Sequence, residues 1–342
     1  MQKILGLPKD DLREVFLQTA FKMGISQPSI IEKDFWVVYL LNLLFSEESF
    51  FENHVFKGGT SLSKCFGLIE RFSEDCDITI SRHLLGFNES LETVSELGSK
   101  KRKRYFEELT DAANLHVRKI SKELSQKIAV QLNYPDWKII VDNEDQQKII
   151  FEYPRSLQLS IYPDDSYVKP KILLEFGCRG ELNPSVKVNI STYAESAFEN
   201  VFSKNNVWVN ALAPERTFWE KITLLHMLAN QDNEKALQDR MARHYYDVYK
   251  LANSDVAKTA SNNIDLLTSV AQHKSIYFKS AQASYETAKP GSLKIIPSEF
   301  LLGKIENDYN AMSEMFFGEP ILFSDILKNL TELENMLNRL KS

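Results

Sequence analysis

The chain has 342 residues, of which 43% are hydrophobic and 11% aromatic, with only 12 Gly and 11 Pro. These values exclude an extensively disordered or low-complexity protein and allow a sizeable buried core. The 41 basic and 47 acidic residues give a net charge of −6, which argues against a wholly cationic protein that coats nucleic acid.

The cysteines and the apolar runs predict a cytoplasmic chain. Cys65, Cys76 and Cys178 are odd in number, widely spaced and set among apolar neighbours, as reduced core thiols are. No apolar run approaches the roughly 18 residues of a membrane span, and the opening MQKILGLPKDDLREVF has acidic residues where a secretory signal is apolar. We therefore expect a cytoplasmic protein that does not contact a membrane.

Two helices are predicted at the start of the chain, over residues 9–22 and 27–46. The second is apolar on nearly every side after its first turn, so we expect it to be buried. A short strand at HVFK follows, then a glycine turn, a helix beginning near Thr60 or Ser61, and a strand at CDITI. This order is strand, turn, helix, strand.

The rest of the chain divides into an insertion, a strand-rich region and a helical region. Residues 84–132 are polar and predict a helical insertion, and residues from Pro214 onward predict further helices. Between them, four stretches predict strands that extend one sheet, namely DWKIIV, QKIIFEYP, SLQLSIYP and KILLEFGC. The predicted class is α+β, with a small mixed sheet, N-terminal helices, the helical insertion and a C-terminal helical bundle, divided into domains 1–210 and 211–342.

The glycine turn GGTSLSK is the first candidate site. Gly58 and Gly59 allow a sharp turn and a close approach to a ligand, and Thr60, Ser61 and the free N–H groups of the next helix could hold phosphate oxygens. The alternative is an ordinary strand-to-helix turn. The turn is not a Walker A loop, because GxxxxGK[ST] is absent.

An acidic pair follows the turn, and a third acidic residue lies farther along. Side chains alternate along a strand, so Asp75 and Asp77 project to one face while Cys76 projects to the other. Two adjacent carboxylates suit Mg²⁺, which also binds substrate phosphates, although a solvated strand end would look the same. Glu175 interrupts the apolar strand KILLEFG and is either an edge residue or a third metal ligand.

These motifs resemble a known family. GGTSL followed by an Asp-x-Asp strand is similar to nucleotidyltransferases of the DNA polymerase beta type. The ordered motifs FKGGTSLSK with RFSEDCDI, PERTFWEKITLLH and RHYYDVYKL resemble the AbiEii toxin family of bacterial abortive-infection and toxin-antitoxin systems, with its MenT relatives. The resemblance runs from IIEKDFW to about residue 252, and the chain after about 253 resembles only a helical tail.

The resemblance implies roles for particular residues. The glycine and hydroxyl motif would contact nucleotide phosphates, the Asp-x-Asp motif would hold metal, and the later motifs would supply a lysine and an aspartate, here Lys221 and Asp247. From the residues alone, Lys221 could instead pair with Glu220 or Glu215, and Asp247 could orient Lys221 or a substrate hydroxyl, or pair with Arg243. The residues that this interpretation places at the nucleotide or metal are Lys57, Gly58, Gly59, Thr60, Ser61, Ser73, Asp75, Asp77, Glu175, Lys221 and Asp247.

Three further groups of residues have two interpretations each. Ser73 either caps a turn or touches phosphate, and we favour capping. A second group consists of the charged residues Glu32, Lys33 and Asp34. They either match the family's opening motif or only position the catalytic lobe around them. The third group is either a solvated helix face or a surface that neutralises polynucleotide phosphates, and consists of Lys100, Lys101, Arg102, Lys103 and Arg104.

The resulting hypothesis is a Mg²⁺-dependent nucleotidyltransferase that moves an NMP from an NTP to an acceptor. The resemblance implies that the acceptor is the 3′ end of tRNA, that the addition blocks translation, and that the partner is an antitoxin protein encoded nearby. Two alternatives stay open: the same site could modify a protein or a small molecule, or the chain could be a non-catalytic module that binds nucleotide or RNA.

Overall fold

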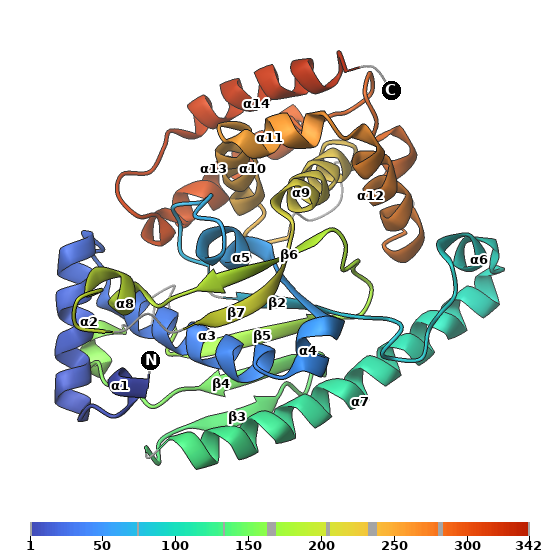
Figure 1. Ribbon diagram of the computed structural model, residues 1–342. Helices are drawn as coiled ribbons and strands as arrows, with labels where there is room; N and C mark the ends of the chain where they lie inside the picture. The colour runs from blue at the N-terminus through green and yellow to red at the C-terminus, as the bar shows by residue number, and fades with distance from the viewer. Residues whose placement is uncertain are drawn as a thin grey trace. The chain divides into compact units, whose positions relative to one another are not determined.

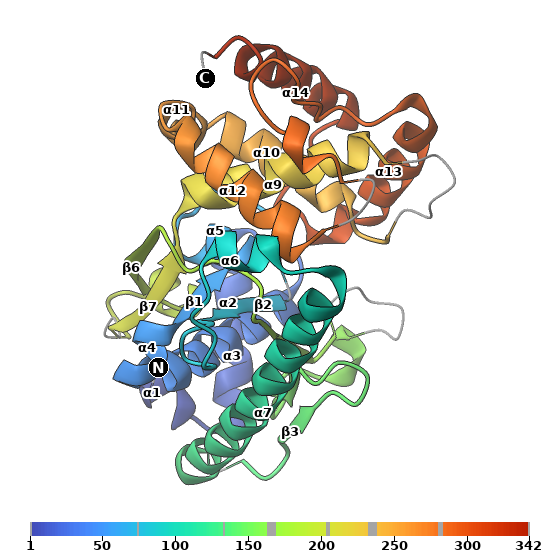
Figure 2. The ribbon, with the colours of Figure 1, turned by 90° about the vertical axis from the view of Figure 1, so that its right-hand side faces the viewer.

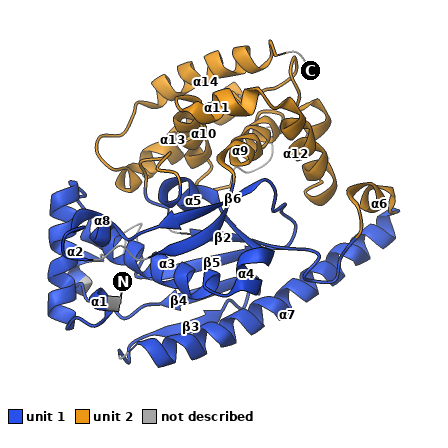
Figure 3. Cartoon of the chain, in the orientation of Figure 1, with its two compact units in different colours: residues 1–65, 72–88, 98–212 blue, residues 66–71, 89–97, 213–342 orange. Residues whose placement is uncertain are grey.

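The structure is a computed structural model that describes residues 2–73, 75–132, 134–162, 169–202, 206–231, 238–279 and 283–340. The chain divides into two compact units, coloured separately in Figure 3. Unit 1 comprises Met1–Cys65, Phe72–Asn88 and Gly98–Leu212, and unit 2 comprises Phe66–Arg71, Glu89–Leu97 and Ala213–Ser342. The predicted domain boundary at 210/211 remains a prediction.

Unit 1 is built on one mixed sheet, whose strand order is β3-β4-β5-β2-β1-β7-β6 (Figure 1). β2 lies between β1, to which it is antiparallel, and β5, to which it is parallel. The strands are β1 (His54–Lys57), β2 (Asp75–Ile80), β3 (Lys138–Val141), β4 (Lys148–Glu152), β5 (Lys171–Gly177), β6 (Ser185–Ile190) and β7 (Val207–Leu212).

Helices accompany this sheet in unit 1. They are α1 (Gln2–Leu5), α2 (Lys9–Met23), α3 (Pro28–Phe45), α4 (Glu48–Asn53), α5 (Gly58–Lys64), α7 (Ser99–Gln131), the 3₁₀ turn η1 (Leu159–Ile161) and α8 (Tyr193–Ala197). α3 packs against β5 and β7, while α7 runs beside β3 (Figure 1). The sheet therefore has one face in the core and another face on which polar residues are half-buried.

Unit 2 is helical, and its helices α9 to α12 lie close together in Figure 2. Its elements are α6 (Leu91–Glu96), α9 (Pro214–Ala229), α10 (Ala242–Ala252), α11 (Asp255–Ser261), α12 (Ile264–Tyr277), η2 (Tyr285–Thr287), α13 (Glu299–Ala311), η3 (Ser313–Met315) and α14 (Phe323–Leu337). The predicted α+β class, with a mixed sheet and a helical C-terminal region, is confirmed. In the part of the chain that is described, no helix is both long and apolar enough to cross a bilayer.

The predicted strand over residues 156–163 is wrong for the part that is described, and Pro163 lies outside the described residues. The carboxylate of Glu32 accepts hydrogen bonds from the backbone N–H of Ser156 at 2.5 Å and from the Tyr162 hydroxyl at 2.7 Å. These bonds hold the segment against α3, where it forms a loop and η1. Two strands, β6 and β7, were missed by the sequence analysis.

Buried charges on α3 tie other segments of unit 1 to the core. Asp34 forms an ion pair with Lys64 of α5 at 2.5 Å and accepts the backbone N–H of Tyr193 at 2.7 Å. Lys33 Nζ donates to the carbonyl of Lys169 at 3.3 Å. Both side chains of the Asp34–Lys64 pair are less than a tenth exposed. The three charged residues of α3, Glu32, Lys33 and Asp34, therefore position the segments around this helix.

We expect Asp34→Asn to destabilise unit 1 strongly, because it leaves the Lys64 ammonium buried without its counter-charge. Breaking a buried pair in this way costs roughly 3–5 kcal/mol in the free energy of unfolding. Thermal and urea denaturation measure the loss. The exposed pair Lys9–Asp136, 42% and 70% exposed, offers a control, since Lys9→Met should change stability little. Equal effects of the two variants would contradict this assignment.

Candidate active site

Four charged residues form a row across adjacent strands of unit 1. The sheet register pairs Lys57 of β1 with Asp77 of β2, Asp77 with Glu175 of β5, and Glu175 with Lys148 of β4. Residues paired in this way project to the same face of a sheet. All four are half-buried. The row therefore has two carboxylates in its centre and a cation at each end.

Asp75 belongs to the same face, two residues before Asp77 on β2. It pairs with Leu173 of β5, and Cys76 between the two acids is fully buried on the opposite face. The alternation that the sequence predicts for these residues is thus what the strand shows. Two carboxylates on neighbouring positions of one face repel each other unless cations or hydrogen-bond donors compensate their charge.

The glycine turn lies directly against one of these acids. Gly58 has φ +79°, in the left-handed region that favours glycine, and a Cβ on it would lie 1.9 Å from Asp77 Oδ2. A side chain at this position would have to displace the Asp77 carboxylate. The first glycine of the motif therefore lets the backbone approach the Asp77 carboxylate.

The two hydroxyl groups after the glycines differ, since that of Thr60 is hydrogen-bonded inside the fold and that of Ser61 is not. Thr60 Oγ1 donates to the backbone carbonyls of Ser73, at 3.2 Å, and Asp75, so it joins α5 to the beginning of β2. Ser61 is 2% exposed, and its buried hydroxyl has no hydrogen-bond partner among the described residues. The proton that Thr60 could have given to a phosphate is therefore engaged. Gly59 is buried within α5, and the Ser73 side chain is 9% exposed.

Glu175 forms an ion pair with a lysine that the sequence analysis missed. Lys148 Nζ lies 2.9 Å from Glu175 Oε1, and this contact raises the pKa of Lys148. Lys148 could have been found from the sequence only by aligning β4 and β5 in the correct register.

The acidic face meets part of what a magnesium ion requires. Within the described ranges, no three His, Cys, Asp or Glu side chains come together as a metal-binding group. Proteins commonly bind Mg²⁺ through one or two carboxylates together with substrate phosphates, and not through a complete protein cage. The hard oxygen donors of Asp75 and Asp77 fit that mode, whereas Glu175 is not gathered with them as a preformed third ligand.

A second group of candidate residues lies in unit 2. Lys221 of α9 forms an ion pair with Asp247 of α10, with 2.8 Å between Nζ and Oδ2. Asp247 also accepts two hydrogen bonds from Arg71, at 2.7 Å from Nε and 2.8 Å from Nη2. Asp247 thus lies against Lys221, as one of the expected alternatives had it, whereas Glu220 pairs with Arg216 of its own helix.

Burial and charge act in opposite directions in this group. Burial alone would raise the pKa of Asp247, but the cations Arg71 and Lys221 hold it below its usual range. Burial lowers the pKa of Lys221, and Asp247 partly offsets this effect. Lys221 Nζ also lies 3.3 Å from His244 Nδ1, and burial together with Lys221 keeps the pKa of His244 well below 6.5. Arg71 was missed because its partner lies 176 positions away.

Most of the basic run at the beginning of α7 faces solvent, while Arg102 is half-buried. Lys103 and Arg104 are each 79% exposed and are paired with Glu107 and Glu108 one turn later. Tyr105 turns inward and is 7% exposed. The run thus forms the exposed face of a helix whose other face is buried, and surface pairs of this kind bind their cations weakly.

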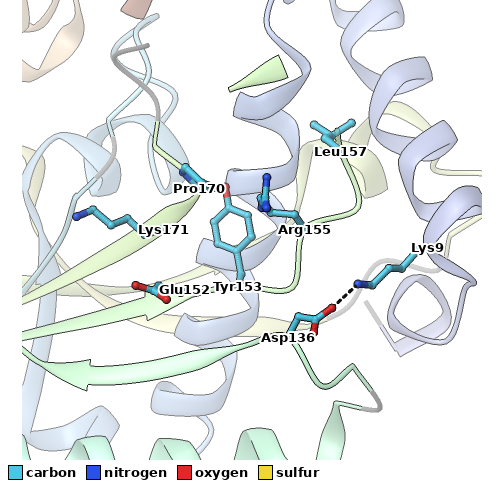
Figure 4. Close-up of a pocket in the computed structure, with 8 residues that line it drawn as sticks. All are labelled: Lys9, Asp136, Glu152, Tyr153, Arg155, Leu157, Pro170 and Lys171. Carbon is cyan, nitrogen blue, oxygen red and sulfur yellow. Dashed lines mark hydrogen bonds and ion pairs between the residues drawn. The ribbon is translucent and has the colours of Figure 1, made fainter. Parts of the chain in front are cut away.

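Figure 4 shows a pocket of about 650 Å³ in unit 1, near the end of β4 and the beginning of β5. Its charged residues have both signs, since Arg155 and Lys171 line it together with Glu152, and Lys9 is paired with Asp136 at 3.0 Å. A pocket of mixed charge lacks the single sign that favours an anion. We therefore base the functional argument on the acidic row and not on this pocket.

The contact between Gly58 and Asp77 yields a stability prediction. Gly58→Ala should lower the melting temperature more than Gly86→Ala, because both positions have positive φ but only Gly58 has an atom in the way. The left-handed backbone costs an alanine about 1–2 kcal/mol at either site. Displacement of the Asp77 carboxylate adds to this cost at Gly58 alone. Equal shifts in the two thermal unfolding curves would show that the contact carries no energy.

Comparison with known proteins finds a solved structure with the same fold. A solved structure of MenT4, a nucleotidyltransferase toxin from Mycobacterium tuberculosis H37Rv, matches with a TM-score of 0.57 and 15% sequence identity, covering 98% of this chain and 91% of that one. This similarity shows a shared fold. A search of curated proteins finds no match.

A family model matches residues 39–329, which is most of the chain and includes the candidate residues from Lys57 to Asp247, whereas Glu32, Lys33 and Asp34 lie before the matched range. Its description is nucleotidyl transferase AbiEii toxin, type IV toxin-antitoxin system. The matched range begins inside α3 and ends inside α14, so it spans the acidic row, the glycine turn and the Lys221–Asp247 pair. The chain belongs to the AbiEii family of nucleotidyltransferase toxins.

Proposed function

We propose that this chain is a magnesium-dependent nucleotidyltransferase that moves an NMP from an NTP to an RNA acceptor, the 3′ end of tRNA. The main support is the placement of Asp77, which lies against the Gly58 turn and in register with Glu175. In the reaction, the acceptor hydroxyl oxygen attacks the α-phosphorus, the bond to the β-phosphate oxygen breaks, and pyrophosphate leaves. Blocking the tRNA end would stop translation.

Each group of residues has a role in this proposal. Asp75 and Asp77 would hold Mg²⁺, which when bound neutralises phosphate charge. The turn at Gly58 and Gly59 would bring backbone N–H groups to the phosphates, with Lys57 beside them. Glu175 would accept the proton of the attacking hydroxyl. Lys221, through the family resemblance, would neutralise the departing pyrophosphate.

The family membership also suggests a protein partner and a cellular location. Since the family consists of toxins of toxin-antitoxin systems, we propose that a cognate antitoxin protein encoded nearby controls this chain in the cytoplasm.

The acidic pair gives a direct test of the reaction. The purified protein is incubated with each α-³²P-labelled NTP, Mg²⁺ and either total RNA or lysate protein. We expect label in the tRNA fraction, and Asp77→Asn should reduce it by roughly a hundredfold or more, because transition-state charge loses its compensation. Asp111→Asn on the exposed face of α7 is the matched control and should label normally.

Three outcomes would contradict parts of this proposal. Label in the protein fraction would show that the acceptor is a protein and not tRNA. Equal labelling by Asp77→Asn and the wild type would remove the catalytic assignment. Nucleotide binding without transfer of label to any acceptor would favour a non-catalytic binding module.

The basic run of α7 gives a second test, which concerns RNA affinity. Replacement of Lys100, Lys101 and Lys103 by Gln should weaken tRNA binding and reduce the slope of log K against log [salt] by about 2, since each phosphate contact on a single strand contributes about 0.7. Fluorescence anisotropy over a salt series measures both. A triple Gln variant at the exposed Lys258, Lys304 and Lys328 removes the same charge from unit 2 as a control. Equal slopes for the two variants would show that the α7 run is only a solvated face.

A further inference from the structure

Arg179 follows β5 by two residues and lies over an aromatic ring of α7. Its guanidinium carbon is 4.9 Å from the centre of the Phe106 ring, and both residues are half-buried. Among the residues that the structure describes, no carboxylate forms an ion pair with Arg179. The guanidinium is planar, weakly hydrated and attracted to aromatic faces, so the two side chains make a flat cationic stack.

The segment that carries Arg179 is anchored near the end of β2. Arg82, two residues after β2, donates from Nη1 to the carbonyl of Gly180 at 2.9 Å, and its guanidinium also pairs with the Glu181 carboxylate. Because β2 and β5 are parallel neighbours, their carboxyl ends lie at the same edge of the sheet. These contacts therefore hold the backbone next to Arg179 at that edge.

The same segment places Arg179 beside the acidic row. A Cβ on the buried Gly180 would lie 2.8 Å from Thr79 Oγ1 and 3.5 Å from Lys57 Nζ, so the backbone here approaches the lysine at one end of the row. Arg179 also comes four residues after Glu175, and four extended residues span at most about 14 Å. A short stretch of single-stranded RNA spans that distance.

The ring of Phe106 has support from a second aromatic residue. Its neighbour Tyr105 is 7% exposed and makes edge-on contacts with both Phe106 and Phe87, with 5.4 Å between the ring centres in each contact. A binding surface is more precise when its side chains are locked by packing in this way. Phe106 is therefore held in place independently of Arg179.

Phe106 also connects Arg179 to the basic run of α7. Arg102 and Lys103 lie four and three residues before Phe106, which places them one turn earlier on the same side of the helix. The basic run, the stack of Arg179 on Phe106 and the acidic row thus follow one another within unit 1.

We propose that Arg179 and Phe106 form a stacking platform for the unpaired terminal base of the RNA acceptor. Proteins bind unpaired bases by stacking them on aromatic side chains and on guanidinium planes. The basic run would neutralise phosphates of the same strand, and the strand's terminal hydroxyl would reach the acidic row. This inference rests on the proposed function, in which the acceptor is RNA.

The NTP brings a second unpaired base to the reaction. The connection from the platform to the basic run favours the acceptor, because a polynucleotide has further phosphates for that run and a single nucleotide does not. The proposal therefore assigns the platform to the acceptor, and the experiment includes the NTP as the other source of a base.

The test measures whether the full chain prefers an RNA that has its terminal base. A short single-stranded RNA with a fluorescent 5′ end, and the same RNA with an abasic 3′-terminal nucleotide, are titrated with the wild type without NTP. Fluorescence anisotropy gives both Kd values at one salt concentration, because the affinity depends on salt. We expect the abasic RNA to bind roughly tenfold more weakly, as the loss of one stacked base requires.

Three variants locate this preference. Arg179→Lys keeps the charge but loses the guanidinium plane, and Phe106→Leu keeps an apolar side chain but loses the ring. Both should bind the abasic RNA like the wild type and lose most of the preference for the intact RNA. Arg118→Gln is the control and should keep the ratio of the two Kd values, since Arg118 is exposed on the same helix about 18 Å along the axis from Phe106. Melting temperatures show whether each variant is folded, and Arg179→Lys decides if Phe106→Leu is not.

A calorimetric titration distinguishes the two sources of the base. The Mg²⁺ complex of an α,β-methylene NTP is titrated into the wild type, Arg179→Lys and Phe106→Leu. All three should bind this analogue equally. A weaker affinity for the analogue in both variants, with an unchanged preference between the two RNAs, would place the NTP base on the platform and overturn the inference.

The remaining outcomes separate this inference from the proposed function. A wild type that binds both RNAs equally would overturn the platform alone, and so would a preference that Arg179→Lys retains in full. A wild type that shows the preference but transfers no NMP to RNA would overturn the proposed function alone, since the RNA titration contains no NTP. A wild type that binds neither RNA would overturn both.

Discussion

The candidate site of unit 1 depends on one steric constraint, the absence of a side chain at residue 58. The Asp77 carboxylate occupies the space where any other residue would place its Cβ, and the positive φ of Gly58 carries the chain past it. This contact places the start of α5 against the centre of the sheet face. A glycine is needed here for two separate reasons, namely backbone conformation and space, and each alone would disfavour another residue.

Electrostatics explains why the acids can occupy that face. Carboxylates on neighbouring positions of a sheet repel each other, and half-burial strengthens the repulsion. The row across β1, β2, β5 and β4 places Lys57 and Lys148 at its ends, so the two central acids each have a cation on the adjacent strand. Asp75 adds a third carboxylate to this face, two residues before Asp77 on the same strand.

The candidate group of unit 2 also combines acids and cations. There one buried carboxylate, that of Asp247, pairs with two buried cations, Arg71 and Lys221. On α3 of unit 1, by contrast, Glu32 and Asp34 are paired and hydrogen-bonded, and they connect the loop before η1, α5 and α8 to the core. Buried charges thus fall into two kinds in this chain. Those on α3 connect segments of unit 1 to the core, while those of the two candidate groups bring several charged side chains to one place.

Local sequence determined much of this protein. The strand at HVFK, the glycine turn, the strand at CDITI, the outward projection of Asp75 and Asp77, and the helices near residues 9–22 and 27–46 follow from periodicity and turn chemistry that act over a few residues. The order of four motifs was enough to place the chain in its family. Only the tertiary structure decided that Lys148 neutralises Glu175, that Arg71 joins Lys221 at Asp247, and that residues 156–162 form a loop beneath Glu32 and not a strand. Each of those outcomes depends on register or on partners far apart in the chain, and local preferences hold no information about which distant charge will be buried beside which.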